Sequence, residues 1–438
     1  MRRWLSLLGV IGLSLAVFST TTPVVRAETV SPYPNAFLTP VISVSVSAAS
    51  MSRHQVGLVA KAARISGSTA AAINFPFLPL TAHTRNGKDL LRLKNKWRIP
   101  FATMVAPVSL VSAIGGPVMA EPLERGEVLM GVTSARVRSA RVGDVITLRD
   151  SKFSPHEFVV GAVVPDLFVD EGDITMSDVS ARVLGKMSIT TVMMTGMASL
   201  SVVTRALLAQ GIGKSSTYRV RYSWDTPNPD APIGTAITKS LLGEFSYRPT
   251  TGTGIQISST WLNKNIVWNK RYSNVDLRHN CHKIVVTAIQ GALNEISKAG
   301  LSRFIDLANS NRYGGCFVAR YNTRGGVFSS PTRHAWGMAF DINTVTDAQG
   351  SVPQMNCSVV RIFRKWGFAW GGNFPWADGM HFEYVGEQRD LLGYPSRYCP
   401  NKAPLLAMTL PQFGTTTTTS STSTSTTTTT TTTTAPIT

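Results

Sequence analysis

The C-terminal third of the chain carries two hydrophobic periods, which predict a helix followed by strands. Between Cys281 and Gly300, apolar side chains recur at spacings of three and four residues, the period of an amphipathic helix. Gly300 is expected to end this helix. From residue 337 the period becomes two, so small residues and Asp341 face one side of a strand while Met338 and Phe340 face the other. The Asp341 side chain is therefore expected to point away from the core, into a cleft.

Residues 28–249 predict a β-rich domain. Valine-rich alternating segments, such as 158–164 and 216–222, are separated by glycines and prolines. The segment 141–148 has the pattern of a turn that leads into a strand, and it resembles the extracellular β-rich domains of bacterial transport permeases. The uncharged stretch 99–120 contains three prolines, so we expect a buried strand and loop there rather than a membrane helix. No catalytic pattern is visible in this domain, whose role is unknown.

Both ends of the chain have simple patterns. Arg2 and Arg3 precede an apolar run that ends at Phe18, and small residues flank Arg26, so residues 1–27 resemble a cleavable signal peptide. A retained membrane anchor is the alternative, but the run is short for a hydrocarbon core of about 30 Å. We expect no stable membrane span after cleavage. Residues 415–434 are all Ser or Thr, which predicts a disordered tail over 403–438, either a glycosylated or wall-threading stalk or low-complexity filler.

Composition favours a folded, exported and basic protein. The chain is 43% hydrophobic and 16% charged, and its net charge is +18. Removal of residues 1–27 takes away three arginines and no acid, which leaves +15. A basic protein favours acidic partners, and export excludes nucleic acid but leaves acidic cell-wall polymers. We therefore expect a secreted or cell-wall location.

The four cysteines predict disulfides, because exported proteins fold in an oxidising compartment. Three pairings are possible. Sequential pairing closes the shorter loops, so we expect Cys281 to bond Cys316 and Cys357 to bond Cys399. A metal site built from these cysteines is less favoured because no two of them have the CxxC spacing.

Two short segments concentrate metal-binding side chains. His334 precedes Asp341 by seven residues, and a later segment contains Asp378, His381 and Glu383. The period of two places His381 and Glu383 on one face of a strand. If the two strands pair, two imidazoles and one carboxylate converge and leave a fourth tetrahedral position for water, which is typical of a catalytic zinc site.

Hydrolysis of an amide requires further groups around such a metal. Asp378, in a turn three residues before His381, is placed to accept a proton and pass it to the leaving nitrogen. A cation near the carbonyl oxygen stabilises the developing charge; Arg320 is the first candidate, and Arg324 and Arg333 are the alternatives. Glu383 fits a partner of His381 better than a metal ligand.

The tryptophans of this region have two interpretations. The indoles of Trp336, Trp370 and Trp376 can stack on sugars, but aromatic residues near glycines more often pack in a core. Trp336 is the candidate for a substrate contact.

Four segments together resemble the zinc D-alanyl-D-alanine carboxypeptidase family, which includes related L-alanyl-D-glutamate endolysins. The segments are 314–320, 333–343, 367–372 and 378–383, and their order and spacing both match. The resemblance implies that zinc is bound by His334, Asp341 and His381, that Asp378 is the catalytic base, and that Arg320 contacts the substrate carbonyl. Thr332 stands where the family commonly has serine, and it keeps the substrate-side hydroxyl.

The sequence as a whole predicts an α+β protein. A β-rich domain (28–249) precedes a zinc-peptidase domain (255–402) with a small antiparallel sheet and flanking helices. The predicted function is an exported zinc peptidase that cuts beside a D-amino acid in peptidoglycan stem peptides, as a carboxypeptidase or an endopeptidase. The alternative is a non-catalytic wall-binding or adhesion protein that retains the zinc domain.

Overall fold

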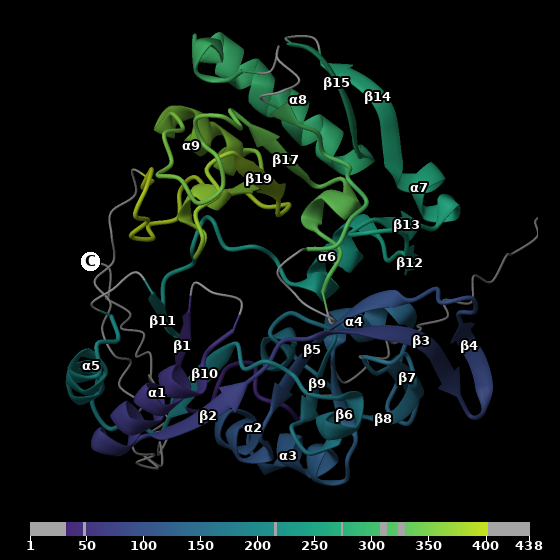
Figure 1. The fold of residues 1–438 in the computed structure, drawn as a ribbon, viewed down its shortest axis with the longest axis vertical. Coiled ribbons are helices and arrows are strands. Elements are labelled where there is room, and N and C mark those ends of the chain that lie inside the picture. Colours follow the sequence, from purple (N-terminus) through teal and green to yellow (C-terminus); the bar gives the residue numbers. More distant parts are fainter. Residues whose placement is uncertain are drawn as a thin grey trace, which may run out of the picture. The chain divides into compact units, whose positions relative to one another are not determined.

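The computed structural model describes residues 32–46, 50–213, 217–272, 275–306, 313–322 and 329–401 (Figure 1). The predicted signal peptide (1–27) and tail (403–438) lie outside these residues. Helices and several sheets alternate along the described chain, so the α+β prediction is confirmed. In the described ranges, no helix is both long and apolar enough to cross a bilayer.

An antiparallel sheet of four strands brings distant segments together in the order β11-β1-β10-β2. Helices α1 (Arg53–Ile65) and α5 (Leu200–Ala209) pack on it through a shared hydrophobic core. Ser52 caps α1, since its hydroxyl accepts from the Gln55 amide while the Gln55 side chain accepts from the Ser52 amide. The strands are β1 (Ile42–Val46), β2 (Thr69–Ile73), β10 (Thr191–Thr195) and β11 (Tyr218–Tyr222).

A second sheet lies between β2 and β10 in the sequence. Its seven strands have the order β4-β3-β5-β9-β6-β8-β7, and an additional pairing of β3 with β7 closes six of them into a ring. Short helices follow several strands: α4 (Val132–Arg138), η1 (Asp166–Val169) and η2 (Ser180–Leu184). The strands are β3 (Phe77–Arg85), β4 (Lys88–Arg92), β5 (Ile99–Ala106), β6 (Val128–Gly131), β7 (Val145–Arg149), β8 (Pro155–Val164) and β9 (Ile174–Ser177).

The prediction for residues 99–120 is correct for the strand and wrong for the loop. Strand β5 is followed by two helices, α2 (Val108–Gly115) and α3 (Pro117–Glu124). Pro107 is the N-cap of α2 and Pro117 is the first residue of α3. A proline at these positions needs no hydrogen-bond donor and has a backbone angle suited to a helix start.

The C-terminal part contains the predicted helix and a small antiparallel sheet. The amphipathic pattern forms α8 (Lys283–Lys298); Gly300, just after it, has a φ of +67°. His282 caps this helix with its ring Nδ1, 3.3 Å from the Ile284 amide. The sheet has the order β16-β17-β19-β18. Its strands are β16 (Tyr313–Gly314), β17 (Ala339–Ile342), β18 (Phe368–Trp370) and β19 (His381–Tyr384).

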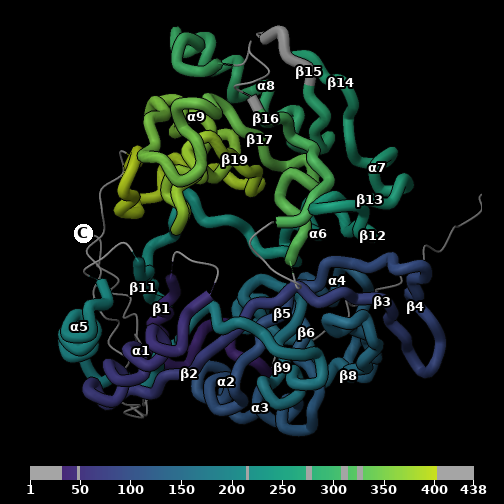
Figure 2. The backbone as a smooth tube through the Cα atoms, viewed as in Figure 1, coloured from purple at the N-terminus to yellow at the C-terminus, as the bar shows by residue number. Residues whose placement is uncertain are grey.

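Helix α9 (Cys357–Lys365) packs against both α8 and β18, beside the sheet (Figure 2). Its Phe363 ring contacts Phe382 of β19, with ring centroids 4.5 Å apart. In β17, the alternating pattern places the side chains of Phe340 and Ile342 in the core, as predicted. The remaining elements are α6 (Thr235–Leu242), α7 (Ser259–Asn265), the ribbons β12 (Tyr247–Pro249) with β13 (Ile255–Ile257) and β14 (Ile266–Tyr272) with β15 (Val275–His282), and the short η3 (Ser302–Phe304), η6 (Arg333–Trp336) and η7 (Gly371–Asn373).

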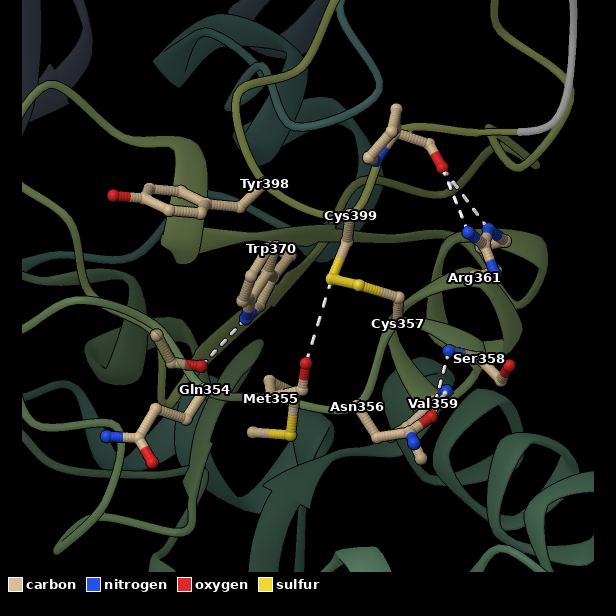
Figure 3. Close-up of a disulfide and its surroundings, with 12 residues drawn as sticks. Gln354, Met355, Asn356, Cys357, Ser358, Val359, Arg361, Trp370, Tyr398 and Cys399 are labelled. Carbon is tan, nitrogen blue, oxygen red and sulfur yellow. Dashed lines mark hydrogen bonds between the residues drawn. A yellow bond between two sulfur atoms is a disulfide. The ribbon is translucent and has the colours of Figure 1, made fainter.

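Two disulfides connect the C-terminal segments in the sequential pairing. Cys281 of β15 bonds Cys316, and Cys357 at the start of α9 bonds Cys399 (Figure 3). Asn356 caps α9, since its side chain accepts from the amides of residues 358 and 359. The second disulfide therefore ties the last described segment to the start of a helix.

A buried ion pair connects α9 to a segment that precedes the predicted domain boundary. Arg364 of α9 is fully buried, and its guanidinium donates to both carboxylate oxygens of Asp230, at 2.9 and 2.6 Å. The remaining nitrogen donates to the carbonyl of Cys399 and the side chain of Asn401. Residues near 230 therefore pack with the C-terminal core. The boundary between 249 and 255 stays a prediction.

We expect Arg364→Met to destabilise the protein by about 3–5 kcal/mol, because it leaves the Asp230 carboxylate buried without its cation. Urea unfolding measures the change. Arg361→Met is the matched control on the same helix, since within the described ranges Arg361 donates to the carbonyl of Pro400 at the surface and to no carboxylate. Equal unfolding free energies for the two variants would contradict a structural role for the pair.

Candidate metal centre

Strand pairing brings the predicted metal ligands together. In the antiparallel pair β17 and β19, Asp341 lies directly opposite His381. The third side chain, His334, belongs to η6, five residues before β17. The left-handed residue Gly337 lies between these two elements, with a φ of +63°. A Cβ at this position would lie 2.8 Å from the His282 amide nitrogen, so the turn requires glycine.

The three side chains lie within metal-binding distance of one another. Each offers one ligand atom, and these atoms are all within 4.8 Å of one another. Asp341 Oδ1 is 3.0 Å from His381 Nδ1, and Asp341 Oδ2 is 3.5 Å from His334 Nε2. Two imidazoles and one carboxylate thus converge, as the strand pattern indicated.

Second partners orient both imidazoles. His334 Nδ1 is 3.2 Å from the carbonyl of Gly315, which directs Nε2 toward Asp341. His381 Nε2 is 3.4 Å from Glu383 Oε2. Glu383 in turn lies 3.8 Å from the guanidinium of Arg333. Histidines that bind metals commonly have such second partners, which fix the orientation of the ring.

The charges of the cluster are strongly coupled. Burial alone would raise the pKa of Asp341, but hydrogen bonds from His334 and His381 hold it well below its usual value. Burial alone would lower the pKa of His381, but the hydrogen bonds to Asp341 and Glu383 raise it to about 10. The His381 ring therefore carries a proton at neutral pH, and a bound metal ion has to replace that proton.

Asp378 lies beside this cluster with one free carboxylate oxygen. Its Oδ2 accepts from Gln349 Nε2 at 2.7 Å, whereas Oδ1 is buried and has no hydrogen-bond partner in the described structure. Burial raises the pKa of Asp378, although the charge of His381 acts against this shift. A buried acceptor without a partner is costly unless a ligand or water supplies the donor.

A glycine allows Asp378 and His381 to approach each other. The Asp378 amide donates to the carbonyl of Gly371, and the His381 amide donates to the carbonyl of Asp378. A Cβ on Gly371 would lie 2.5 Å from the Asp378 carbonyl oxygen and 3.1 Å from His381 Cβ. Any larger residue at position 371 would push Asp378 and His381 apart.

Residues 329–384 match the family model described as D-alanyl-D-alanine carboxypeptidase. The match covers η6, β17, β19 and Asp378, and so includes all three residues of the candidate metal cluster. No curated protein matches the chain. Among solved structures, the extracellular domain of the noncanonic ABC-type transporter YknZ from Gram-positive bacteria is similar at 9% identity and a TM-score of 0.25, over 41% of this chain and 99% of that domain.

Thr332 and Trp336, the two residues predicted to contact the substrate, lie in different environments. Thr332 is partly buried, and its hydroxyl has no hydrogen-bond partner in the described part of the chain. Trp336 is only 1% exposed and packs on Phe245, with ring centroids 4.6 Å apart. The substrate contact expected for Trp336 does not agree with this burial, because the indole belongs to the core. Trp370 is also buried, whereas Trp376 is 48% exposed.

The candidate arginines also lie in different environments. Arg320 is half-buried; its guanidinium donates to the carbonyl of Tyr321 at 3.4 Å, and its backbone carbonyl accepts from the Thr332 amide. Arg333 points toward α6, where it donates to Thr238 Oγ1 at 2.7 Å and to the carbonyl of Ile233. Arg324 lies outside the described residues.

Two features of the site escaped the sequence analysis. Gln349 donates to Asp378, and the Arg333 guanidinium lies 3.8 Å from Glu383. Neither residue has a metal-binding side chain, so only the pairing across the fold identifies it. A second group of possible ligands, His279 with Cys281 and Cys316, has its sulfurs in a disulfide and offers no thiolate.

Proposed function

We propose that this protein is an exported, zinc-dependent peptidase that hydrolyses a peptide bond beside a D-amino acid in peptidoglycan stem peptides. One observation carries the proposal: His334, Asp341 and His381 converge beside a carboxylate, Asp378, whose free oxygen is buried. The match of residues 329–384 to the carboxypeptidase family supports the substrate class.

The residues present fit a zinc ion. Two imidazoles and one carboxylate are a common set of protein ligands in catalytic zinc sites, which keep a position open for water. A zinc ion held by these residues supplies Lewis acidity and lowers the pKa of water to about 7. His334 and His381 each have a second partner that fixes the ring, so the donor set is already ordered.

Asp378 is suited to move the proton. Gln349 holds Oδ2, so the carboxylate cannot rotate freely, and Oδ1 is the oxygen without a hydrogen-bond partner among the described residues. In the proposed reaction, Oδ1 accepts a proton from the attacking water as the new C–O bond forms. It then donates this proton to the amide nitrogen as the C–N bond breaks. The carboxylate returns to its starting state, and no other reactant is required.

Arg320 is the proposed partner of the substrate carbonyl. Among the described residues, its guanidinium makes one long hydrogen bond, to Tyr321, and we propose that its other N–H groups bind a ligand. Thr332 is the proposed substrate-side hydroxyl, because its oxygen has no hydrogen-bond partner in the described part of the chain and its amide donates to the Arg320 carbonyl. A preorganised donor at the developing oxyanion typically contributes about 3 kcal/mol of transition-state stabilisation.

The wall location follows from charge and cysteine chemistry. Both disulfides are suited to an oxidising compartment outside the cytoplasm. The basic chain would be attracted to acidic polymers of the wall, which would raise its local concentration near the substrate.

Digestion of purified peptidoglycan by the mature chain tests the proposal. We expect release of a D-amino acid or a cleaved stem peptide, identified by mass, with loss of activity on chelation and recovery with added zinc. The mass of the fragment also separates carboxypeptidase from endopeptidase action. Zinc bound at one equivalent with no product from any wall fragment would reject hydrolysis and favour a wall-binding protein.

A further inference from the structure

A basic pocket of about 430 Å³ lies beside the metal cluster. Strand β11 contributes Arg219 to it, and the segment 372–377 lines the other side. Phe374 of this segment also contacts the metal site, since its ring centroid is 5.9 Å from that of His381. The pocket and the proposed catalytic centre therefore share a wall.

One face of β11 carries two arginines, of which Arg219 lines this pocket. Tyr218, Val220 and Tyr222 pack against the core beneath the four-stranded sheet. The intervening Arg219 and Arg221 lie on the other face. Arg219 donates to the carbonyls of residues 374 and 375, and Arg221 donates to the hydroxyl of Tyr394 at 3.0 Å. The strand thus places the Arg219 guanidinium next to the segment that follows β18 and the Arg221 guanidinium next to Tyr394.

A third guanidinium, that of Arg397, completes a cluster without a carboxylate. Arg397 is exposed, lines the pocket and lies over the ring of Tyr398. No Asp or Glu lines the pocket, and none forms an ion pair with Arg219, Arg221 or Arg397 in the described structure. Like charges held together without an acid repel one another, and an anion relieves this repulsion.

Arg219 has a donor nitrogen that lacks a hydrogen-bond acceptor in the described structure. Its Nε is buried and has no hydrogen-bond partner within the described ranges. Burial lowers the pKa of its guanidinium, and the neighbouring Arg397 and Arg221 lower it further. Arginine presents its N–H groups in a planar fork that matches a carboxylate.

We propose that this pocket binds a carboxylate of the stem peptide that is separate from the reacting amide, and thereby selects acidic peptides over amidated ones. This inference rests on the proposed function, because the shared wall at Phe374 connects the pocket to the catalytic centre. The exposed indole of Trp376 forms part of the pocket rim and offers an apolar surface to the adjoining part of the peptide.

Binding to the Asp378→Asn protein tests the pocket without any turnover. Two synthetic stem peptides are compared, identical except that one carboxylate away from the scissile bond is free in one and amidated in the other. We expect the free acid to bind about tenfold more tightly or better, since hydrogen bonds to a charged group are strong. Arg397→Gln should remove most of this preference. It should not disturb the fold, because Arg397 is exposed and, within the described residues, its guanidinium packs on the Tyr398 ring without an ion pair.

Arg182→Gln is the matched control, since it removes the same charge from an exposed helix outside the pocket. It should keep the full preference. Equal binding of the two peptides by the Asp378→Asn protein would overturn the inference. The inference would also be overturned if Arg182→Gln lost as much of the preference for the free acid as Arg397→Gln does. That result would mean that the net charge of the protein, and not the pocket, produces the preference.

The same two peptides separate this inference from the proposed function. Turnover by the wild-type chain at equal kcat/KM on both peptides would keep the peptidase and overturn the pocket. A binding preference that depends on Arg397, without any turnover by wild type, would support the pocket and reject hydrolysis. A glycerol-phosphate polymer that binds through Arg397, while both peptides bind equally, would assign the pocket to a wall polymer and overturn the peptide proposal.

Discussion

The Asp378→Asn variant is expected to bind zinc as the wild type does and to lose about 10²- to 10⁴-fold in kcat, the usual contribution of a positioned proton acceptor. An asparagine can keep the hydrogen bond from Gln349 but cannot take a proton from water. Asp378 is not one of the three converging ligands, so the metal should stay. Product release followed by mass measures turnover, and elemental analysis measures the zinc.

Asp390→Asn provides the matched control. Asp390 also accepts from a glutamine, since Gln388 Nε2 lies 2.9 Å from its Oδ1, but it is outside the metal cluster. This variant should keep wild-type turnover. If Asp378→Asn retained full activity at one equivalent of zinc, another group would have to carry the proton, and the role proposed for Asp378 would be wrong.

Local periodicity predicted the orientation of two of the three converging side chains, Asp341 and His381, whereas His334 lies outside the strands. A period of two placed Asp341 on one face of β17 and placed His381 with Glu383 on one face of β19. Pairing these strands then required the ligands to meet, and the register sets Asp341 opposite His381. Helix α8 was predictable for the same reason, because its apolar stripe repeats with the helical period.

Contacts between distant segments could not be predicted in this way. Nothing local in the sequence relates Gln349 to Asp378, or Arg333 to Glu383. The link between Asp230 and Arg364 spans more than a hundred residues. Such contacts depend on how loops return to the sheet, and a polar residue in a loop has no periodicity that reveals its partner.

Two residue types were misleading because their effect depends on position. Pro107 and Pro117 were interpreted as breaks, yet each stands where a helix begins. Trp336 lies between a ligand and a strand, where a substrate contact is plausible from sequence, but its ring packs on Phe245 in the core. A large aromatic ring that is buried near glycines stabilises the fold around the site, and its surface is not available to a ligand.

Removal of one ligand should have the second large effect: His381→Ala is expected to weaken zinc binding by about 300-fold or more. Three ligands share an apparent binding free energy on the order of 10 kcal/mol or more, so the loss of one costs roughly a third of it. Competition with a zinc chelator of known affinity measures the change. His156→Ala is the control, since His156 lies on β8, outside the cluster, and should keep wild-type affinity.

Wild-type zinc binding gives an independent test of the same ligand. In the metal-free protein the pKa of His381 is about 10, so its ring is protonated throughout the pH range from 6 to 8. A metal ion binds only the neutral imidazole, and binding must therefore release about one proton, with an apparent affinity that rises roughly tenfold per pH unit. Calorimetry in two buffers of different ionisation enthalpy counts this proton. Zinc binding that releases no proton, or that persists at full strength in His381→Ala, would place the metal elsewhere and remove the basis for hydrolysis at this site.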